Sequence, residues 1–254
     1  MKISFITPTA DRPHFLQGLY SLVLKQTVSD WEWLIYDSGH HPVTFKDSRV
    51  IYIHHESIIS IGAKRNHLIA RASGDVIIHL DDDDYYAADY GNFILQQLVH
   101  YDFYTAHSWF SYDLKSKQTY YWATDEIART QFMIDALLGM RVREIDFGSE
   151  QKSQVSMLNE KGQTGYGFSY AYRKAITKTC YFQDKDLSED RSFYFAVKAA
   201  GWTIGMEKDA TGRVVHVIHE TNISGEYPQY RIPRFLAEKH LPDFFHYLSS
   251  YHEN

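Results

Sequence analysis

The chain has 254 residues, of which 44% are hydrophobic and 23% are charged, as in globular proteins. Its net charge is −6 and it has no block of basic residues, so a nucleic-acid polymer is not expected as a partner. The single cysteine, Cys180, excludes an internal disulfide. We recognise no signal peptide and no apolar run of membrane-spanning length. These features predict one large α/β domain, and we expect it in the cytoplasm.

The first third of the chain alternates short apolar runs with amphipathic stretches. We expect strands at residues 2–7, 33–36, 50–53 and 76–80, and helices that begin near residue 12 and at residue 61. Pro8 should end the first strand, Asp11 should be the N-cap of the first helix, and Gly74 should close the second. This order is typical of a mostly parallel sheet with helices on its faces.

The rest of the chain is less regular. The pattern predicts helices at residues 87–101, 125–140, 188–200 and 233–251, and strands at 103–110, 119–122, 168–173, 203–206 and 214–219. Residues 141–165 are polar without periodicity, which predicts a mobile loop.

The predicted terminal helix carries an apolar stripe beside basic residues. The stripe consists of Leu236, Leu241, Phe244, Phe245 and Leu248. Such a helix can contact a membrane surface or a partner, whereas packing on its own domain is the alternative that we favour.

Four consecutive carboxylates, Asp81 to Asp84, end the predicted buried strand at residues 76–80. If this segment stays extended, Asp81 and Asp83 share one face, and Asp82 and Asp84 share the other. Two carboxylates at the carboxyl end of a buried strand provide oxygen ligands for Mg²⁺ or Mn²⁺. A solvated acidic loop is the alternative.

Five motifs, in this order along the chain, resemble those of family-2 glycosyltransferases with the GT-A fold. They lie at residues 5–9 with 11–12, at 36–39, 62–66 and 80–84, and at 188–190 followed by Gly201 and Trp202. The resemblance covers about residues 1–225 and implies one GT-A domain with a mostly parallel central sheet flanked by helices. It further implies a nucleotide-sugar half at about 1–110, an acceptor half at about 111–225 and a C-terminal helical extension at 226–254.

The resemblance also implies roles for individual residues. Donor-binding residues would be Thr7, Pro8, Thr9, Asp11, Arg12, Asp37, Arg65, Asn66, Asp81 and Asp82. Asp83, with Asp81 and His219, would hold Mn²⁺ or Mg²⁺, and His216 competes with His219 for this role. Asp190 would be the general base, with Glu189 beside it. The family often has two acids where this chain has Asp37 and Ser38, which leaves one carboxylate to read the base.

The implied reaction is inverting transfer of a sugar from a nucleotide-sugar, with UDP as the expected nucleotide, to a hydroxyl of a carbohydrate or glycolipid acceptor. Surface polysaccharide synthesis is the expected setting, in the cytoplasm or peripheral to the inner face of the membrane. A nucleotidyltransferase is one alternative, although residues 7–13 lack the glycines of its usual first loop. A catalytically silent nucleotide-binding or scaffold protein of the same fold is the other.

Overall fold

The computed structural model describes residues 1–56, 59–123, 164, 166–222 and 230–251. The first half contains β1 (Ile3–Thr9), α1 (Pro13–Leu24), β2 (Trp31–Asp37), β3 (Val50–His54), α2 (Ile61–Arg71), β4 (Val76–His79), β5 (Tyr85–Tyr86) and α3 (Tyr90–His100). The second half contains β6 (Phe103–Asp113), β7 (Gln118–Ala123), β8 (Ala171–Arg173), α6 (Glu189–Ala199), β9 (Ile204–Lys208), β10 (Val214–Ile218), β11 (Tyr230–Ile232), α7 (Arg234–His240) and α8 (Pro242–Tyr251). Two 3₁₀ turns, η2 (Gly167–Ser169) and η3 (Lys174–Lys178), flank β8.

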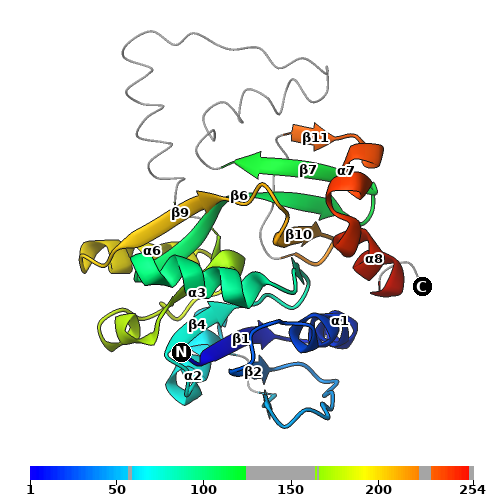
Figure 1. Ribbon diagram of the computed structural model, residues 1–254. Coiled ribbons are helices and arrows are strands. Elements are labelled where there is room, and N and C mark those ends of the chain that lie inside the picture. The colour runs from blue at the N-terminus through cyan, green and yellow to red at the C-terminus, as the bar shows by residue number, and fades with distance from the viewer. Residues whose placement is uncertain (57–58, 124–163, 165, 223–229, 252–254) are drawn as a thin grey trace, which may run out of the picture.

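The strands of the described residues form one sheet, whose main path is β11-β7-β6-β8-β4-β1-β2-β3 (Figure 1). Strand β1 pairs in parallel with β2 and β4, and β2 pairs in parallel with β3. Strands β2 and β4 are buried along their whole length, as parallel strands covered on both faces are. Among the described strands only β5, β7 and β8 run against the others, so the mostly parallel central sheet is confirmed.

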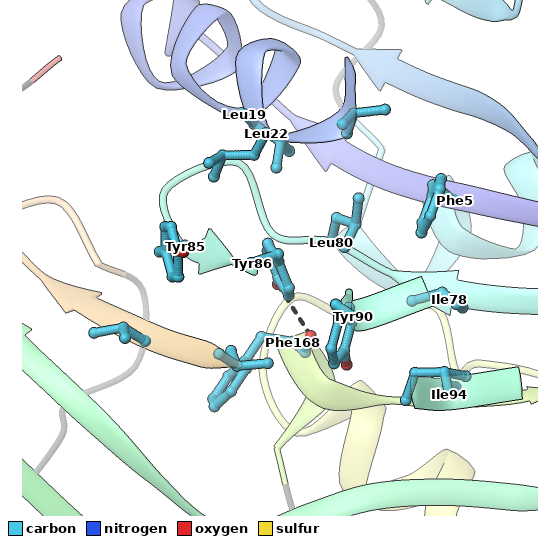
Figure 2. Close-up of a cluster of buried hydrophobic side chains, with 14 of the residues drawn as sticks. Phe5, Leu19, Leu22, Ile78, Leu80, Tyr85, Tyr86, Tyr90, Ile94 and Phe168 are labelled. Carbon is cyan, nitrogen blue, oxygen red and sulfur yellow. Dashed lines mark hydrogen bonds between the residues drawn. The ribbon is translucent and has the colours of Figure 1, made fainter. Parts of the chain in front are cut away.

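Helices cover both faces of the sheet. Helices α1, α3 and α8 contribute Leu19, Ile94 and Phe244 to one apolar cluster, together with alternate residues of β1 and β4. Figure 2 shows part of this cluster, in which Leu19 and Leu22 face Leu80 and Tyr86. The other cluster lies between the opposite face of the sheet and helices α2 and α6. Strand β4, which leads into the acidic segment, therefore lies between two well-packed layers.

The C-terminal segment differs from the single helix predicted at 233–251. It forms α7 and α8, because Pro242 has no N–H for a helical hydrogen bond and begins a new helix. Leu241, Phe244 and Leu248 are buried in the main core, whereas Leu236 of α7 is 45% exposed. The favoured alternative, packing on its own domain, therefore accounts for most of the stripe. Among the described helices none has the length and apolar character needed to cross a membrane.

Several expected end points are wrong. Strand β1 continues through Pro8 to Thr9, since parallel pairing to Tyr36 persists there. Asp11 is not the N-cap of α1; it has a positive φ of 56°, and Arg12 takes the N-cap position. Helix α2 ends at Arg71, and Gly74 instead allows close approach to the backbone of Lys2. The predicted helix at 125–140 lies outside the described residues. So does the predicted loop at 141–165, apart from Thr164.

Glu32 of β2 makes a buried polar contact that predicts acid sensitivity. Its carboxylate accepts hydrogen bonds from Lys2 Nζ at 2.8 Å, Ser4 Oγ at 2.6 Å and Ser73 Oγ at 2.7 Å. Burial alone would raise its pKa, but these hydrogen bonds outweigh burial and lower the pKa to about 2. At pH values above the ordinary pKa of a glutamate, the lowered pKa stabilises the folded state by up to about 3 kcal/mol.

We therefore expect Glu32→Gln to lower the free energy of unfolding at neutral pH by up to about 3 kcal/mol. The folded-state pKa lies below the unfolded value of 4.5, so the difference from wild type should shrink as the pH falls from 4.5 toward 2. Urea unfolding across this range measures it, with the exposed Glu207→Gln as the control. A difference that stays constant with pH would contradict the assignment.

Candidate active site

The acidic segment forms a turn after β4 and does not stay extended. Asp82 and Asp83 are turn residues, and β5 starts at Tyr85. The expected alternation of faces is therefore wrong, because a turn directs successive side chains differently from a strand. Asp82 and Asp83 both face Arg12, whose Nη1 donates to Asp82 Oδ1 at 3.1 Å and to Asp83 Oδ2 at 2.7 Å.

Asp82 is held further by the hydroxyl of Thr9 at the end of β1. Burial raises the pKa of Asp82 to about 7, and the charge of Asp83 adds to the effect, although Arg12 and Thr9 oppose it. Arg12 also donates to the carbonyl of Thr221. The ends of β1 and β4 are thus joined through one guanidinium group to the segment that follows β10.

Asp84 is fully buried and has other partners than Asp82 and Asp83. Its carboxylate contacts His216 Nδ1 at 2.9 Å and accepts the Val217 N–H at 2.9 Å. Burial raises its pKa to about 7, against the effect of His216. Asp84 therefore fixes the turn to β10, in line with a structural role for this residue.

Arg65 joins the acidic turn to the start of α6. Its side chain is only 4% exposed, and it donates to Asp81 Oδ1 at 3.3 Å and to Glu189 Oε1. Burial raises the pKa of Glu189 although Arg65 opposes this, and burial likewise raises the pKa of Asp81. Glu189 is thus bound by Arg65, while the adjacent carboxylate has different contacts.

Asp190, the predicted base, is partly buried in the first turn of α6. Its Oδ2 accepts the Gly167 N–H at 3.0 Å, and its Oδ1 accepts the Arg191 N–H at 2.6 Å. Ser188 takes the N-cap position with a positive φ of 60° but makes no side-chain capping bond.

A cavity of about 430 Å³ opens between these groups. Its lining includes Pro8, Thr9, Arg12, Lys64, Arg65, Asp81, Asp82, Asp83, Gly167, Glu189, Asp190 and His216. Residues from the ends of β1 and β4 thus face the start of α6 across one space. This edge is where open α/β sheets bind ligands.

Some predicted donor-binding residues lie elsewhere. Thr7 is buried and its hydroxyl donates to the Leu80 carbonyl at 2.7 Å. The side-chain amide of Asn66 is held by the backbone of Phe182: its Nδ2 donates to the carbonyl at 2.8 Å and its Oδ1 accepts the N–H at 3.1 Å. Asp11 is exposed and contacts His40. Asp37 is buried, and its oxygens accept from Gly39 N–H and Tyr52 Oη, each at 2.7 Å. None of the four is among the residues that line the cavity.

Lys64 lines the cavity but was not predicted from the sequence. It is 5% exposed, and its ammonium group donates to the Thr9 carbonyl at 3.0 Å. Burial lowers its pKa, although the nearby charges of Asp37 and Asp186 oppose this. The resemblance implied a donor-binding role for its neighbour Arg65, and only the fold shows that Lys64 faces the same space.

The proposed metal ligands are brought together in part. Asp83 Oδ2 lies 2.9 Å from His219 Nε2, whereas Asp81 is turned to Arg65. Among the described residues no group of three or more acidic, histidine or cysteine side chains is arranged to hold a metal ion. Even so, the donor types fit Mg²⁺ or Mn²⁺. Burial raises the pKa of Asp81, Asp82 and Asp84. At Asp83 burial alone would raise the pKa, but the hydrogen bond with His219 and the charge of Arg12 outweigh burial and lower the pKa, which favours the ionised carboxylate that a metal ligand needs.

Comparison with known sequences indicates a glycosyltransferase. The model of the family described as glycosyl transferase family 2 matches residues 4–180. The Escherichia coli protein UDP-Glc:alpha-D-GlcNAc-diphosphoundecaprenol beta-1,3-glucosyltransferase WfgD is 33% identical over 93 residues, which are 34% of this chain and 37% of that protein. The matched part is thus about a third of either chain.

Solved structures show the fold. Staphylococcus aureus TarS 1–349 superposes with a TM-score of 0.57 at 16% identity, over 85% of this chain and 60% of that one. The mannosyltransferase PcManGT from Pyrobaculum calidifontis, solved with GDP-Man and Mn²⁺, has a TM-score of 0.52 at 11% identity, over 89% of this chain and 58% of that one. These likenesses confirm the GT-A type of α/β fold. With the family model matching well over half of its length, the chain belongs to glycosyl transferase family 2.

Proposed function

We propose that this protein is an inverting glycosyltransferase that uses a nucleotide-sugar donor. The observation that carries the proposal is the cavity of about 430 Å³ that Asp190 shares with the acidic end of β4. Such a transferase needs a place for the donor diphosphate and a base for the acceptor hydroxyl, and the two ends of this cavity supply suitable groups. Family membership supports the same chemistry.

The donor diphosphate would lie at the end of the cavity lined by the acidic turn. Asp83, with Asp81 and His219, would hold Mn²⁺ or Mg²⁺ there, and the metal would stabilise the negative charge of the leaving diphosphate. Lys64 and Arg12 bring further positive charge to the same end. His219 Nδ1 accepts from the Thr221 N–H, so His219 presents N–H at Nε2 and would have to change tautomer to bind metal.

Asp190 would accept the proton of the acceptor hydroxyl as its oxygen attacks the anomeric carbon. The bond from that carbon to the diphosphate oxygen breaks as the new glycosidic bond forms on the opposite face, which inverts the configuration. Asp190 suits this role better than Glu189, because Glu189 is bound by the guanidinium of Arg65. The acceptor would be a hydroxyl of a carbohydrate or glycolipid.

We propose UDP as the nucleotide. The name of WfgD specifies UDP-Glc, which supports this choice. The reaction is tested by measuring free UDP released from a panel of UDP-sugars, with and without Mn²⁺. Release that needs both the protein and a metal supports the proposal, and no release from any nucleotide-sugar would contradict it.

We predict that UDP binding depends on a divalent cation, because the diphosphate and the buried carboxylates repel each other unless a cation lies between them. Calorimetric titration with UDP should give clear binding in Mn²⁺ and little binding in EDTA. Asp83→Asn should weaken metal-dependent UDP binding, since a charged ligand is lost, whereas Asp30→Asn at an exposed site should not. Equal affinity for UDP in Mn²⁺ and in EDTA would remove the metal from the mechanism.

A further inference from the structure

The turn η2, residues 167–169, lies between the acidic turn and α6 and is buried throughout. A side chain at Gly167 would place a Cβ 3.0 Å from Asp190 Cβ and 3.2 Å from both terminal nitrogens of Arg65. Glycine therefore lets the backbone approach α6 closely enough for its N–H to reach Asp190 Oδ2 at 3.0 Å. The position of this turn thus affects the position of Asp190.

Two side chains, one from β4 and one from β5, form hydrogen bonds with carbonyls of η2. Tyr86 Oη donates to the Phe168 carbonyl at 3.0 Å and accepts the Asp81 N–H at 2.9 Å. Figure 2 shows this hydroxyl pointing from β5 to Phe168. One hydroxyl therefore connects the backbone of Asp81 to η2.

The second side chain is His79, which is 1% exposed and ends β4. Its Nδ1 lies 3.0 Å from the Gly167 carbonyl and its Nε2 lies 3.0 Å from Tyr172 Oη. A carbonyl only accepts, so Nδ1 must carry the hydrogen, and a neutral ring then accepts from the Tyr172 hydroxyl at Nε2. The contacts assign the tautomer and show that His79 holds Gly167 from the strand side.

We propose that His79 and Tyr86 are positioning residues that set Asp190 relative to the acidic turn through η2. They act on the two ends of the cavity at once, because β4 and β5 carry them and η2 bonds directly to Asp190. Misplacing reacting groups by about 1 Å can cost about 10²-fold in rate. This inference rests on the proposed role of Asp190 as base.

The chain provides a matched control. Tyr86 and Tyr90 are each 1% exposed, with ring centroids 5.3 Å apart. Among the residues that the structure describes, the hydroxyl of Tyr90 has no hydrogen-bond partner, so Tyr90→Phe removes a buried hydroxyl without removing a described hydrogen bond. Tyr86→Phe removes the same atom together with both bonds to η2 and Asp81.

We expect Tyr86→Phe to lower kcat by about 10-fold, with donor KM and UDP affinity near wild type, and Tyr90→Phe to leave all of them near wild type. His79→Phe should lower kcat similarly, and His79→Asn, which places an amide N–H near the Nδ1 position, should restore much of it. A thermal unfolding scan of each variant separates loss of fold from loss of turnover. Equal kcat for Tyr86→Phe and Tyr90→Phe would overturn the inference.

A double-mutant cycle separates this inference from the proposed function. If Tyr86 acts through Asp190, Tyr86→Phe should have little further effect on turnover in an Asp190→Asn background. Should Asp190→Asn alone leave turnover unchanged, the assignment of the base fails. If Asp190→Asn abolishes most turnover but Tyr86→Phe still lowers the remainder about 10-fold, the base stands and the positioning role is wrong.

Discussion

Asp190→Asn should lower turnover by about 10²–10⁴-fold, the range expected when a positioned base is lost. The affinities for UDP and for the metal should stay near wild type. An amide cannot take the proton of the acceptor hydroxyl, but it has nearly the same shape. Its oxygen can still accept the Gly167 N–H that Asp190 Oδ2 accepts at 3.0 Å. Steady-state kinetics with a true acceptor and calorimetry with UDP and Mn²⁺ together measure the two effects.

The control is Asp243→Asn, because Asp243 is also an acid in the first turn of a helix but lies outside the cavity of Asp190. Loss of such a charge at a helix start costs about 0.3–1 kcal/mol of stability and should not affect turnover. An Asp190→Asn protein with wild-type turnover and a similar small loss of stability would show that Asp190 only caps its helix. Glu189 would then be the next carboxylate to test.

Arg65→Met should lower the free energy of unfolding by about 3–5 kcal/mol, as for other buried ion pairs that lose one partner. The guanidinium is 4% exposed and contacts both Asp81, at 3.3 Å, and Glu189. Methionine can fill similar space but leaves the buried carboxylate of Glu189 and the partly exposed carboxylate of Asp81 without their cation. Urea unfolding measures the loss, with the exposed Arg71→Met on the same helix as the control, expected within about 0.5 kcal/mol of wild type.

Adding Glu189→Gln to Arg65→Met should recover part of this stability, because one buried charge is removed with its partner. The loss in Arg65→Met alone should also shrink as the pH falls toward the ordinary pKa of a carboxyl group, since an unpaired buried carboxylate regains stability when it binds a proton. A loss no larger than that of Arg71→Met would show that the Arg65 contacts contribute little.

Local patterns predicted much of this fold. Strands β1, β2 and β4 are four to seven residues long and mostly apolar, and helices α1, α2 and α6 carry apolar stripes. Both are patterns among neighbouring residues, so they can be recognised in the sequence. Since parallel strands end at one edge, the acids after β4 were expected at the binding edge. Errors arose where a single residue changes backbone geometry, as at Pro242, or where consecutive acids form a turn.

The α/β class, the succession of strands along the chain and the acids at a strand end could be predicted from the sequence, because they depend on short-range pattern. Which charges meet became known only from the fold. Arg65 reaches Glu189 across 124 positions and His219 reaches Asp83 across 136. The fold also decided that Asn66 holds backbone while Lys64 lines the cavity. Buried polar groups must form hydrogen bonds with whichever groups the fold places beside them. Because those partners can be more than a hundred positions away, the spacing of residues in the sequence does not predict them.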